Sequence, residues 1–340
     1  MVEPTVKAPA QKQLVDLFGR VHKSLRISIT DKCSLRCTYC MPAEGLPWLP
    51  NSAILTREEI LRLARIAHGA GFRDFRITGG EPLVRRDVVD IVAGLAAMGT
   101  EDDPIDLAMT TNGILLSSFA PALREAGLQR LNVSLDTLKK DRFKELTLRD
   151  RFDQVISGLE AAKKEGFSPI KLNTLLIPGV NDDEILDLLD FALEGGYELR
   201  FIEQMPLGGA PWDGSNIITQ AQILETLSSR HRLDPVPDRT NAPAARWRVD
   251  GGPQTVGVIA SVTAPFCGDC DRLRITADGA LRNCLFSDLE TDLLTPMRAG
   301  ASDETLLDVM GVATRQKDAG HLIGRSEFSR PKRGMSAIGG

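Results

Sequence analysis

Short runs rich in β-branched residues alternate with helical patterns over the first two thirds of the chain, and this alternation constrains the fold more than any other feature. Strands that alternate with helices pair in parallel within one sheet, so the pattern predicts an α/β fold. Six strands are expected, at residues 24–30, 73–78, 105–111, 130–135, 169–175 and 197–202. A closed TIM barrel needs about eight such units, so six units predict an open, partial (β/α)6 TIM-like barrel.

Helices are expected between these strands. The clearest start is Thr56-Arg57-Glu58-Glu59, a capping box in which the threonine and the second glutamate each accept a hydrogen bond from the other's backbone N–H group. Further helices are expected to begin near Asp87, Ser117, Phe152 and Asn181. These helices would cover the outside of the barrel.

The βα pattern ends near residue 232. The proline-rich segment 234–238 breaks the chain, and hairpin-like runs follow at 255–262 and 273–276. We therefore expect a barrel domain at residues 1–235 and a smaller C-terminal region at 236–340 that covers the open side of the barrel. The chain closes with a basic segment that ends in Gly339-Gly340. Taken alone, such a segment is typical of a frayed terminus.

Polar side chains share one face of the expected strands. Because side chains alternate along a strand, four polar residues lie opposite the apolar ones that helices would cover: Arg26, Arg76, Thr110 and Lys171. This polar face would point into the barrel. A buried cation without a partner is costly, so the cations either form internal ion pairs with acids such as Asp74 and Asp106 or line a cavity for a polyanionic small molecule.

The first of two cysteine sets follows the first expected strand. Cys33, Cys37 and Cys40 have C-x3-C-x2-C spacing, and Gly79-Gly80 at the end of the second strand lets the backbone approach a bound group closely. A cubane iron–sulfur cluster held by three thiolates keeps one iron without a protein ligand. Zinc is the alternative, but a structural zinc site takes four protein ligands and no fourth is nearby.

The second set consists of Cys267, Cys270 and Cys284. Two arginines, Arg272 and Arg274, lie on one strand face directly beside it. A zinc knuckle is the alternative for the C-x2-C pair, and three ligands with one open position argue against it.

Charge and hydropathy narrow the class of protein. Lys and Arg total 41 against 46 Asp and Glu, a formal net charge of −5 that argues against a nucleic-acid binder. No apolar run approaches about 18 residues and the N-terminal segment lacks the apolar core of a signal peptide, so we expect no membrane contact and a cytoplasmic location. In that reducing compartment, cysteines serve as metal ligands or reactive thiols rather than as disulfides.

The first cysteine set, with an aromatic residue before its last cysteine, and the Gly-Gly-Glu-Pro turn at 79–82 together resemble the radical S-adenosylmethionine superfamily. The resemblance implies a [4Fe-4S] cluster on the catalytic residues Cys33, Cys37 and Cys40, whose open iron binds the amino and carboxylate groups of S-adenosylmethionine. One electron from such a cluster would cleave the carbon–sulfur bond and give methionine and a 5′-deoxyadenosyl radical.

Within that superfamily, the chain is similar over nearly its whole length to the GTP 3′,8-cyclases, the radical enzymes that open molybdenum cofactor biosynthesis. The matching stretches are 25–31 with the first cysteine loop, 76–82, 110–113, 132–136, 171–173, 200–205, 267–284 and 339–340. The similarity implies a glycine tail that reaches the active site. Ala337 stands where this family often carries an aromatic residue, so Met335 or Ile338 is expected to anchor the tail instead.

The same resemblance assigns the contacts to cofactors and substrate. A second [4Fe-4S] cluster would be held by Cys267, Cys270 and Cys284. S-adenosylmethionine would contact Tyr39, Gly80, Ser134 and Met205. GTP, with its guanine against the open iron of the second cluster, would contact Arg26, Arg76, Thr110, Lys171, Arg272 and Arg274.

The implied activity is that of a lyase. The 5′-deoxyadenosyl radical would remove H3′ of GTP, and the resulting carbon radical would attack C8, to give after reduction (8S)-3′,8-cyclo-7,8-dihydroguanosine 5′-triphosphate. The implied partners are an electron donor and cyclic pyranopterin monophosphate synthase, which would take the product; a homodimer stays open. Two other functions also stay open: a radical S-adenosylmethionine enzyme with an auxiliary cluster that acts on a peptide, and a non-enzymatic iron–sulfur redox protein.

Overall fold

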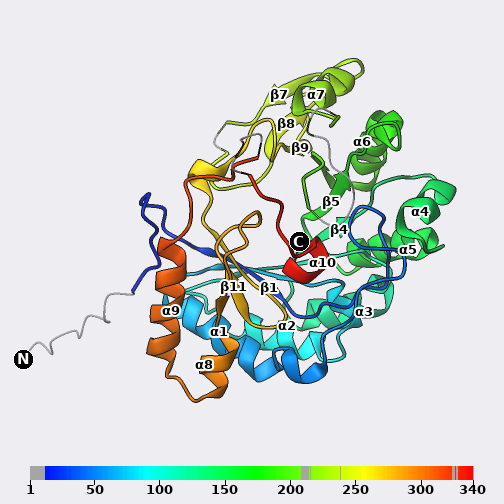
Figure 1. Cartoon of the computed structure of the whole chain (residues 1–340). Coiled ribbons are helices and arrows are strands. Elements are labelled where there is room, and N and C mark those ends of the chain that lie inside the picture. Colours follow the sequence, from blue (N-terminus) through cyan, green and yellow to red (C-terminus); the bar gives the residue numbers. More distant parts are fainter. Residues whose placement is uncertain are drawn as a thin grey trace, which may run out of the picture.

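The computed structural model describes residues 12–207, 214, 216–237, 239–323, 326 and 328–339. Within these ranges the strands form one 12-stranded sheet in the order β12-β11-β10-β1-β2-β3-β4-β5-β6-β9-β8-β7 (Figure 1). Its end strands, β12 and β7, do not pair with each other, so the barrel is open. The fold class predicted from the alternation of strands and helices is confirmed.

The six expected strands form the centre of this sheet. They are β1 (Ser24–Ser28), β2 (Asp74–Thr78), β3 (Asp106–Thr111), β4 (Arg130–Ser134), β5 (Ile170–Leu175) and β6 (Glu198–Ile202). All neighbouring pairs among them are parallel and follow the order of the chain. Each strand lies inside its expected range, because turn residues bound each run of β-branched and apolar residues.

Helices connect these strands and cover the outer face of the sheet (Figure 1). They are α1 (Arg57–Gly69), α2 (Val88–Ala96), α3 (Leu116–Glu125), α4 (Lys140–Thr147), α5 (Phe152–Lys164) and α6 (Ile185–Gly195). The predicted capping box is present, since the Thr56 hydroxyl accepts from the Glu59 N–H and the Glu59 carboxylate accepts from the Thr56 N–H at 2.8 Å. Over the described ranges, no helix has both the length and the apolar character needed to cross a bilayer.

The C-terminal strands extend the same sheet at both edges. β9 (Thr255–Ile259) runs parallel to β6, and β10 (Arg272–Ile275) runs parallel to β1. Antiparallel strands then follow on each side: β8 (Ala245–Val249), β7 (Leu233–Pro235), β11 (Ala280–Arg282) and β12 (Thr291–Asp292). α8 (Leu294–Arg298), α9 (Asp303–Arg315) and α10 (Met335–Ile338) are the helices after residue 235, whereas α7 (Gln220–Ser228), like β7, lies before residue 236. The division of the chain at residue 235 stays a prediction.

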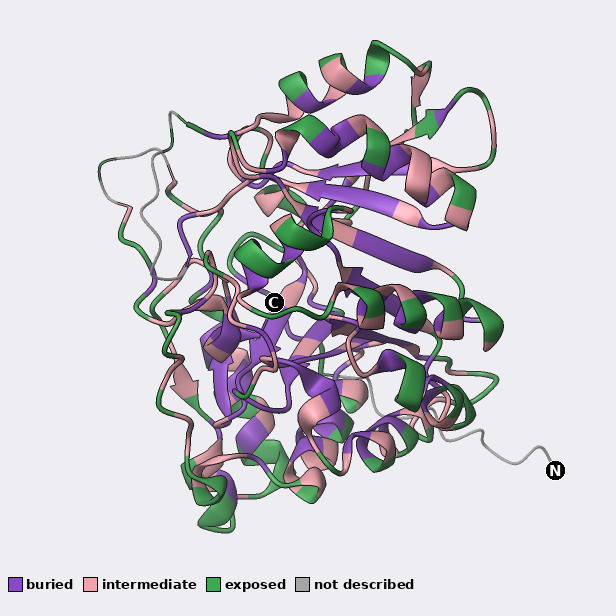
Figure 2. Ribbon diagram, turned by 90° about the vertical axis from the view of Figure 1, so that its right-hand side faces the viewer, coloured by how far each residue is buried: buried purple, intermediate pink, exposed green. Residues whose placement is uncertain are grey.

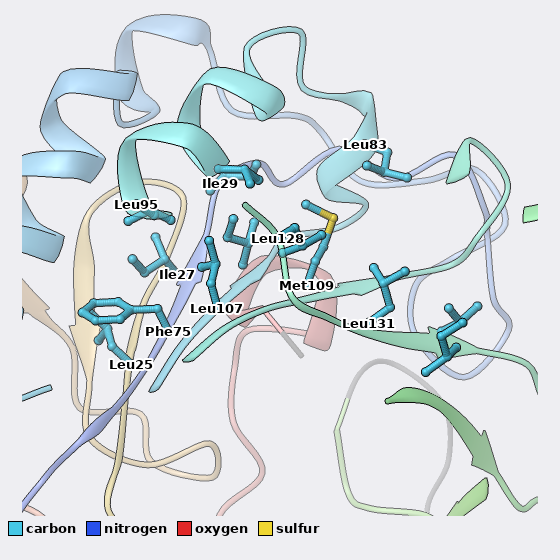
Figure 3. Packing of buried hydrophobic residues seen from close by; sticks show 14 of the residues in the cluster. Leu25, Ile27, Ile29, Phe75, Leu83, Leu95, Leu107, Met109, Leu128 and Leu131 are labelled. Carbon is cyan, nitrogen blue, oxygen red and sulfur yellow. The ribbon is translucent and has the colours of Figure 1, made fainter. Parts of the chain in front are cut away.

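The hydrophobic core lies between the sheet and its outer helices. Figure 3 shows Leu25 of β1 near Phe75 of β2 and Leu107 of β3, and all three side chains are 0% exposed. The strands are largely buried and the outward surfaces of the helices are exposed (Figure 2). Each such side chain stabilises the fold by about 1.5–3 kcal/mol on leaving water. Because the apolar faces of the strands meet the helices, the polar faces look into the barrel, as the alternation predicts.

Candidate active site

A row of arginines crosses three neighbouring strands on the inner face of the barrel. Arg274 of β10 is in register with Arg26 of β1, and Arg26 is in register with Arg76 of β2. Arg272 lies two residues before Arg274 and therefore on the same face. These four arginines and Thr110 line one cavity, called here the arginine cavity. The structure thus brings together five of the six residues predicted to contact GTP.

The charge of this row is only partly offset, because Asp74 attracts Arg26 and Arg76 without forming an ion pair with either. Within the described ranges Arg26 and Arg76 form no ion pair, and the buried Nε of Arg76 has no hydrogen-bond partner. Asp106, one of the two acids considered as internal partners, pairs with Arg130 instead. Asp74, the other, accepts a hydrogen bond from a serine of β1. The cavity therefore favours the polyanion interpretation over internal ion pairs.

Burial of these guanidinium groups opposes their charge. Burial is the main reason why the pKa values of Arg76 and of Arg274 are lowered to about 10. The like charge of Arg272 acts in the same direction at both residues, and Asp74 opposes the shift at Arg76. Burial, followed by the charges of Arg274 and Arg76, lowers the pKa of Arg26 well below its ordinary value. An anion in the cavity would oppose these shifts, because an opposite charge nearby favours the charged form. Guanidinium groups bind phosphate oxygens in pairs, so a phosphate-rich ligand fits this site.

Lys171, the sixth predicted GTP contact, is not among the residues that line the arginine cavity. It is buried on β5, where burial and then the charge of Arg200 lower its pKa to about 8. Arg200 of β6 does line the cavity, and it pairs with Glu198 at 2.6 Å. The sequence prediction missed Arg200, which the alternation of side chains along β6 would have identified.

A second cavity adjoins the first and contains the first cysteine loop. Cys33, Cys37 and Cys40 line it, together with the Gly79-Gly80 turn. A Cβ at Gly80 would lie 2.4 Å from the Lys32 carbonyl oxygen, so glycine is required for this close approach of the two loops. The wall between the cavities is made of residues that line both: Tyr39, Thr110, Ser134, Asp136 and Met335.

The four residues predicted to contact S-adenosylmethionine divide between these cavities. Gly80 lines the second cavity only. Tyr39 and Ser134 belong to the shared wall, and Met205 lines the arginine cavity only. A ligand that touches all four would therefore extend along the boundary between the two cavities.

The thiols of Cys33, Cys37 and Cys40 need a bound positive charge to become thiolates. Burial raises the pKa of Cys33, raises that of Cys37 well above its ordinary value, and raises that of Cys40 to about 12. Thiolates here need metal to stay ionised. Among the described residues, no three His, Cys, Asp or Glu side chains gather closely enough for one metal ion. Three thiolates without a fourth protein ligand suit a [4Fe-4S] cluster, in which each would bind a different iron, better than a structural zinc ion.

Two buried carboxylates that the sequence prediction did not select fix the loops of the second cavity. Glu81 accepts from the Asn112 N–H at 2.6 Å and from a threonine hydroxyl at 2.8 Å, and burial raises its pKa to about 7. Asp136 accepts from the Tyr39 hydroxyl at 2.6 Å, and burial raises its pKa to about 6. Both lie in stretches that carry the family resemblance, which was the signal available in the sequence.

The second cysteine set lies beside the arginine cavity. Phe266 and Leu285, the neighbours of Cys267 and Cys284, line that cavity. Burial raises the pKa of Cys267, and the charges of Cys284 and Cys270 act in the same direction. Arg20 Nη1 donates to the Cys267 carbonyl at 2.6 Å and fixes this loop from the N-terminal side.

The C-terminal tail enters the barrel and ends near its centre (Figure 1). Arg274 Nη1 donates to the Gly339 carbonyl at 2.8 Å. A Cβ at Gly339 would lie 2.9 Å from the Ser28 Cβ, and the φ of Gly339 is +86°, so glycine is needed for both reasons. The frayed end suggested by composition does not hold for residues 328–339, and Gly340 lies outside the described residues.

The residues before Gly339 hold the tail in place. Ile338 is 1% exposed, and Met335 lines both cavities. Ala337 instead borders a separate cavity beside Trp48. That Met335 or Ile338 anchors the tail in place of an aromatic residue at 337 stays a prediction.

Comparison with known proteins decides the family. The profile of the Radical SAM superfamily matches residues 27–192, and that of Molybdenum Cofactor Synthesis C matches residues 197–323. A GTP 3′,8-cyclase of Streptomyces coelicolor is 51% identical over 331 residues, which cover 96% of each chain. The chain belongs to the GTP 3′,8-cyclase family. A further member of this family, from Corynebacterium glutamicum, is 47% identical over 98% of this chain and 91% of the relative.

Solved structures share the fold of this family member at low sequence identity. SuiB of Streptococcus suis bound to the precursor peptide SuiA has a TM-score of 0.59 and 16% identity, over 88% of this chain and 68% of that chain. SuiB bound to S-adenosylmethionine has a TM-score of 0.56, over 82% and 66%. Membership of the superfamily brings with it a [4Fe-4S] cluster and S-adenosylmethionine, and the cavity with the first cysteine loop has the residues to hold them.

Proposed function

We propose that this member of the family converts GTP to (8S)-3′,8-cyclo-7,8-dihydroguanosine 5′-triphosphate, the first step of molybdenum cofactor biosynthesis. One observation carries the proposal. Four arginines meet in a cavity beside the first cysteine loop, and within the described ranges none of them has a carboxylate partner: Arg26, Arg76, Arg272 and Arg274.

The triphosphate would be held by this arginine row. Arg272 is placed for it because its guanidinium lies over the Phe266 ring, 4.8 Å from the centroid. Arg274 uses Nη1 for the Gly339 carbonyl, and its other N–H groups can bind phosphate oxygens while the tail stays in place. Lys171 is buried on β5 and does not line the cavity. It would contribute positive charge rather than a surface of the cavity.

The shared wall would place the two ligands side by side. Thr110 and Ser134 separate the arginine cavity from the second cavity by a single layer of side chains. When bound, the first cluster and S-adenosylmethionine supply the 5′-deoxyadenosyl radical that removes H3′ of GTP. The chain's own part is to orient the ribose and exclude water. Met335 of the tail lies at this boundary, and Met205 lines the arginine cavity, and both are apolar residues suited to this role.

We include a second [4Fe-4S] cluster on Cys267, Cys270 and Cys284, next to the guanine end of the cavity. An external one-electron donor, transfer of the product to cyclic pyranopterin monophosphate synthase and a cytoplasmic location belong to the same proposal.

The two other functions fit the site less well. A peptide substrate would leave the arginine row largely without anionic partners, and the likeness to SuiB concerns the fold alone. A non-enzymatic redox protein would have no use for a ligand cavity beside the Gly-Gly-Glu-Pro turn.

The proposal is tested by anaerobic reconstitution, followed by incubation with GTP, S-adenosylmethionine and a strong reductant. GTP deuterated at C3′ should transfer its deuterium to 5′-deoxyadenosine, and the cyclised triphosphate should accumulate. ATP serves as the control nucleotide and should give neither result. Protein that carries both clusters but forms no 5′-deoxyadenosine with GTP would overturn the proposal.

A further inference from the structure

A buried lysine lies against the second cysteine set. Lys317 follows the C-terminal end of α9 and is 4% exposed. Its Nζ donates to the Cys270 Sγ at 3.4 Å and to the Arg272 carbonyl at 2.8 Å. The ammonium group therefore joins the cysteine loop to the strand that carries the arginine row. Neither the sequence motifs nor the family resemblance gives this lysine a role.

The surroundings of Lys317 compensate its charge incompletely. A buried ammonium group is costly unless an opposite charge accompanies it. In the part of the chain that the structure describes, Lys317 forms no ion pair with a carboxylate, and its two acceptors are a carbonyl and a sulfur. A thiol is a weak acceptor, whereas a metal-bound thiolate carries negative charge. The position of this lysine is thus best explained by a thiolate at Cys270 that a cluster keeps ionised.

The lysine is held in this position by the segment around it. Its backbone N–H donates to the Thr314 carbonyl at 3.0 Å. Arg20 donates to the Asp318 carbonyl and to the Cys267 carbonyl, both at 2.6 Å, and so ties the segment after α9 to the cysteine loop. Because the loop and the lysine are fixed to the same guanidinium, the contact between Nζ and Cys270 is part of the loop's structure.

We propose that Lys317 is a positioning residue that raises the reduction potential of the second cluster through its hydrogen bond to Cys270. The inference rests on the proposed function, because it requires that cluster. One-electron reduction converts [4Fe-4S]2+ to [4Fe-4S]1+ and adds negative charge, which spreads onto the sulfur ligands. A hydrogen-bond donor and a positive charge at one of these sulfurs stabilise the reduced form more than the oxidised form. Lys317 therefore favours uptake of the electron by the cluster nearest the substrate.

The test is a potentiometric titration followed by EPR, in the full-length chain with Cys33→Ala, Cys37→Ala and Cys40→Ala so that only the second cluster is present. Lys317→Met, at full iron content, should shift the midpoint potential to a more negative value. Lys317→Arg keeps the positive charge and the N–H donors, so most of this shift in midpoint potential should be absent from it. Arg315→Met is the control, because it removes an exposed charge from the end of α9. Its midpoint potential should equal that of the chain in which both Arg315 and Lys317 are present.

The outcomes separate this inference from the proposed function. If no second cluster assembles even with Lys317 present, the proposed function fails and this inference fails with it. If the cluster assembles and Lys317→Met leaves its potential unchanged, only the role of Lys317 is refuted. If Lys317→Met does not assemble the cluster, Lys317→Gln takes its place, because glutamine keeps an N–H donor but has no charge. The inference then requires a more negative midpoint potential in Lys317→Gln than in Lys317→Arg.

Discussion

Buried arginines without acid partners oppose the stability of the free protein. Arg76 is one of five arginines that line the arginine cavity, and its Nε has no partner among the described residues. Burial lowers its pKa to about 10, which means that the site disfavours the charged form. Such a group is expected where a ligand supplies the missing charge, since a purely structural role would be served better by an apolar side chain.

Arg76→Met should therefore separate stability from binding. We expect GTP affinity to fall about tenfold to a hundredfold, since hydrogen bonds to charged groups contribute about 1.5–3 kcal/mol. The free energy of unfolding should stay unchanged or rise, because a buried unpaired charge is removed. Arg130→Met is the matched control: its guanidinium pairs with Asp106 outside the cavity lining, so it should lower stability slightly and leave affinity unchanged. Isothermal titration calorimetry measures the GTP affinity, and urea unfolding measures the free energy of unfolding. An equal loss of affinity in the two variants would contradict the assignment of Arg76 to GTP binding.

The alternation of side chains predicted Arg26, Arg76 and Thr110 because it follows from the covalent geometry of a strand. The alternation put Lys171 on the same face, but it did not predict that this residue stays outside the cavity lining. In a barrel the strands are tilted and staggered, so a residue's face does not fix its height along the barrel axis. The contact of Lys317 was not predictable either, since it depends on how the segment after α9 packs against a loop 47 residues away.

At the scale of elements, α10 shows how a short helix can become part of a site. Its four residues are too few to be stable alone, and its neighbour Gly339 is held by Arg274 between β1 and β2. The tail therefore depends on the barrel for its structure. No local pattern predicts this dependence, because helix propensity and end composition describe only the segment itself.

Gly339→Ala should displace the tail. The added Cβ would meet Ser28 and the φ of +86° would be strained, so the bond to Arg274 would be lost and turnover of GTP should fall about tenfold or more. Gly300→Ala is the control, because Gly300 has a φ of +87° but no atom within 4 Å of its Cβ position. That variant should carry the strain and keep its activity. Hydrogen exchange of the last residues should rise only in Gly339→Ala; unchanged exchange there would show that the tail tolerates the substitution.

At the scale of the whole molecule, the two ends of the sheet depend on the C-terminal residues. β10 pairs with β1 and β9 pairs with β6, so the C-terminal region completes both edges of the six-stranded sheet. The six central strands were predictable from local patterns. The pairing of β9 and β10 with distant edges was not, because it joins residues far apart in the sequence. The arginine row itself is made of strands from both parts, so the site exists only in the whole chain.

This architecture predicts one cooperative unfolding transition for residues 12–339 rather than two. Separation of the C-terminal strands would expose the edges of β1 and β6 and uncover apolar side chains such as Leu25 and Phe201, which are 0% exposed. Urea unfolding of the cluster-free protein should give the same midpoint by far-ultraviolet circular dichroism and by tryptophan fluorescence. The fluorescence comes from three tryptophans: Trp48 before α1, Trp247 in β8, and Trp212, which lies outside the described residues. A fragment of residues 1–235 should then fail to fold and to bind GTP. Two separated transitions, or a folded fragment, would show that the C-terminal region covers a barrel that is stable without it.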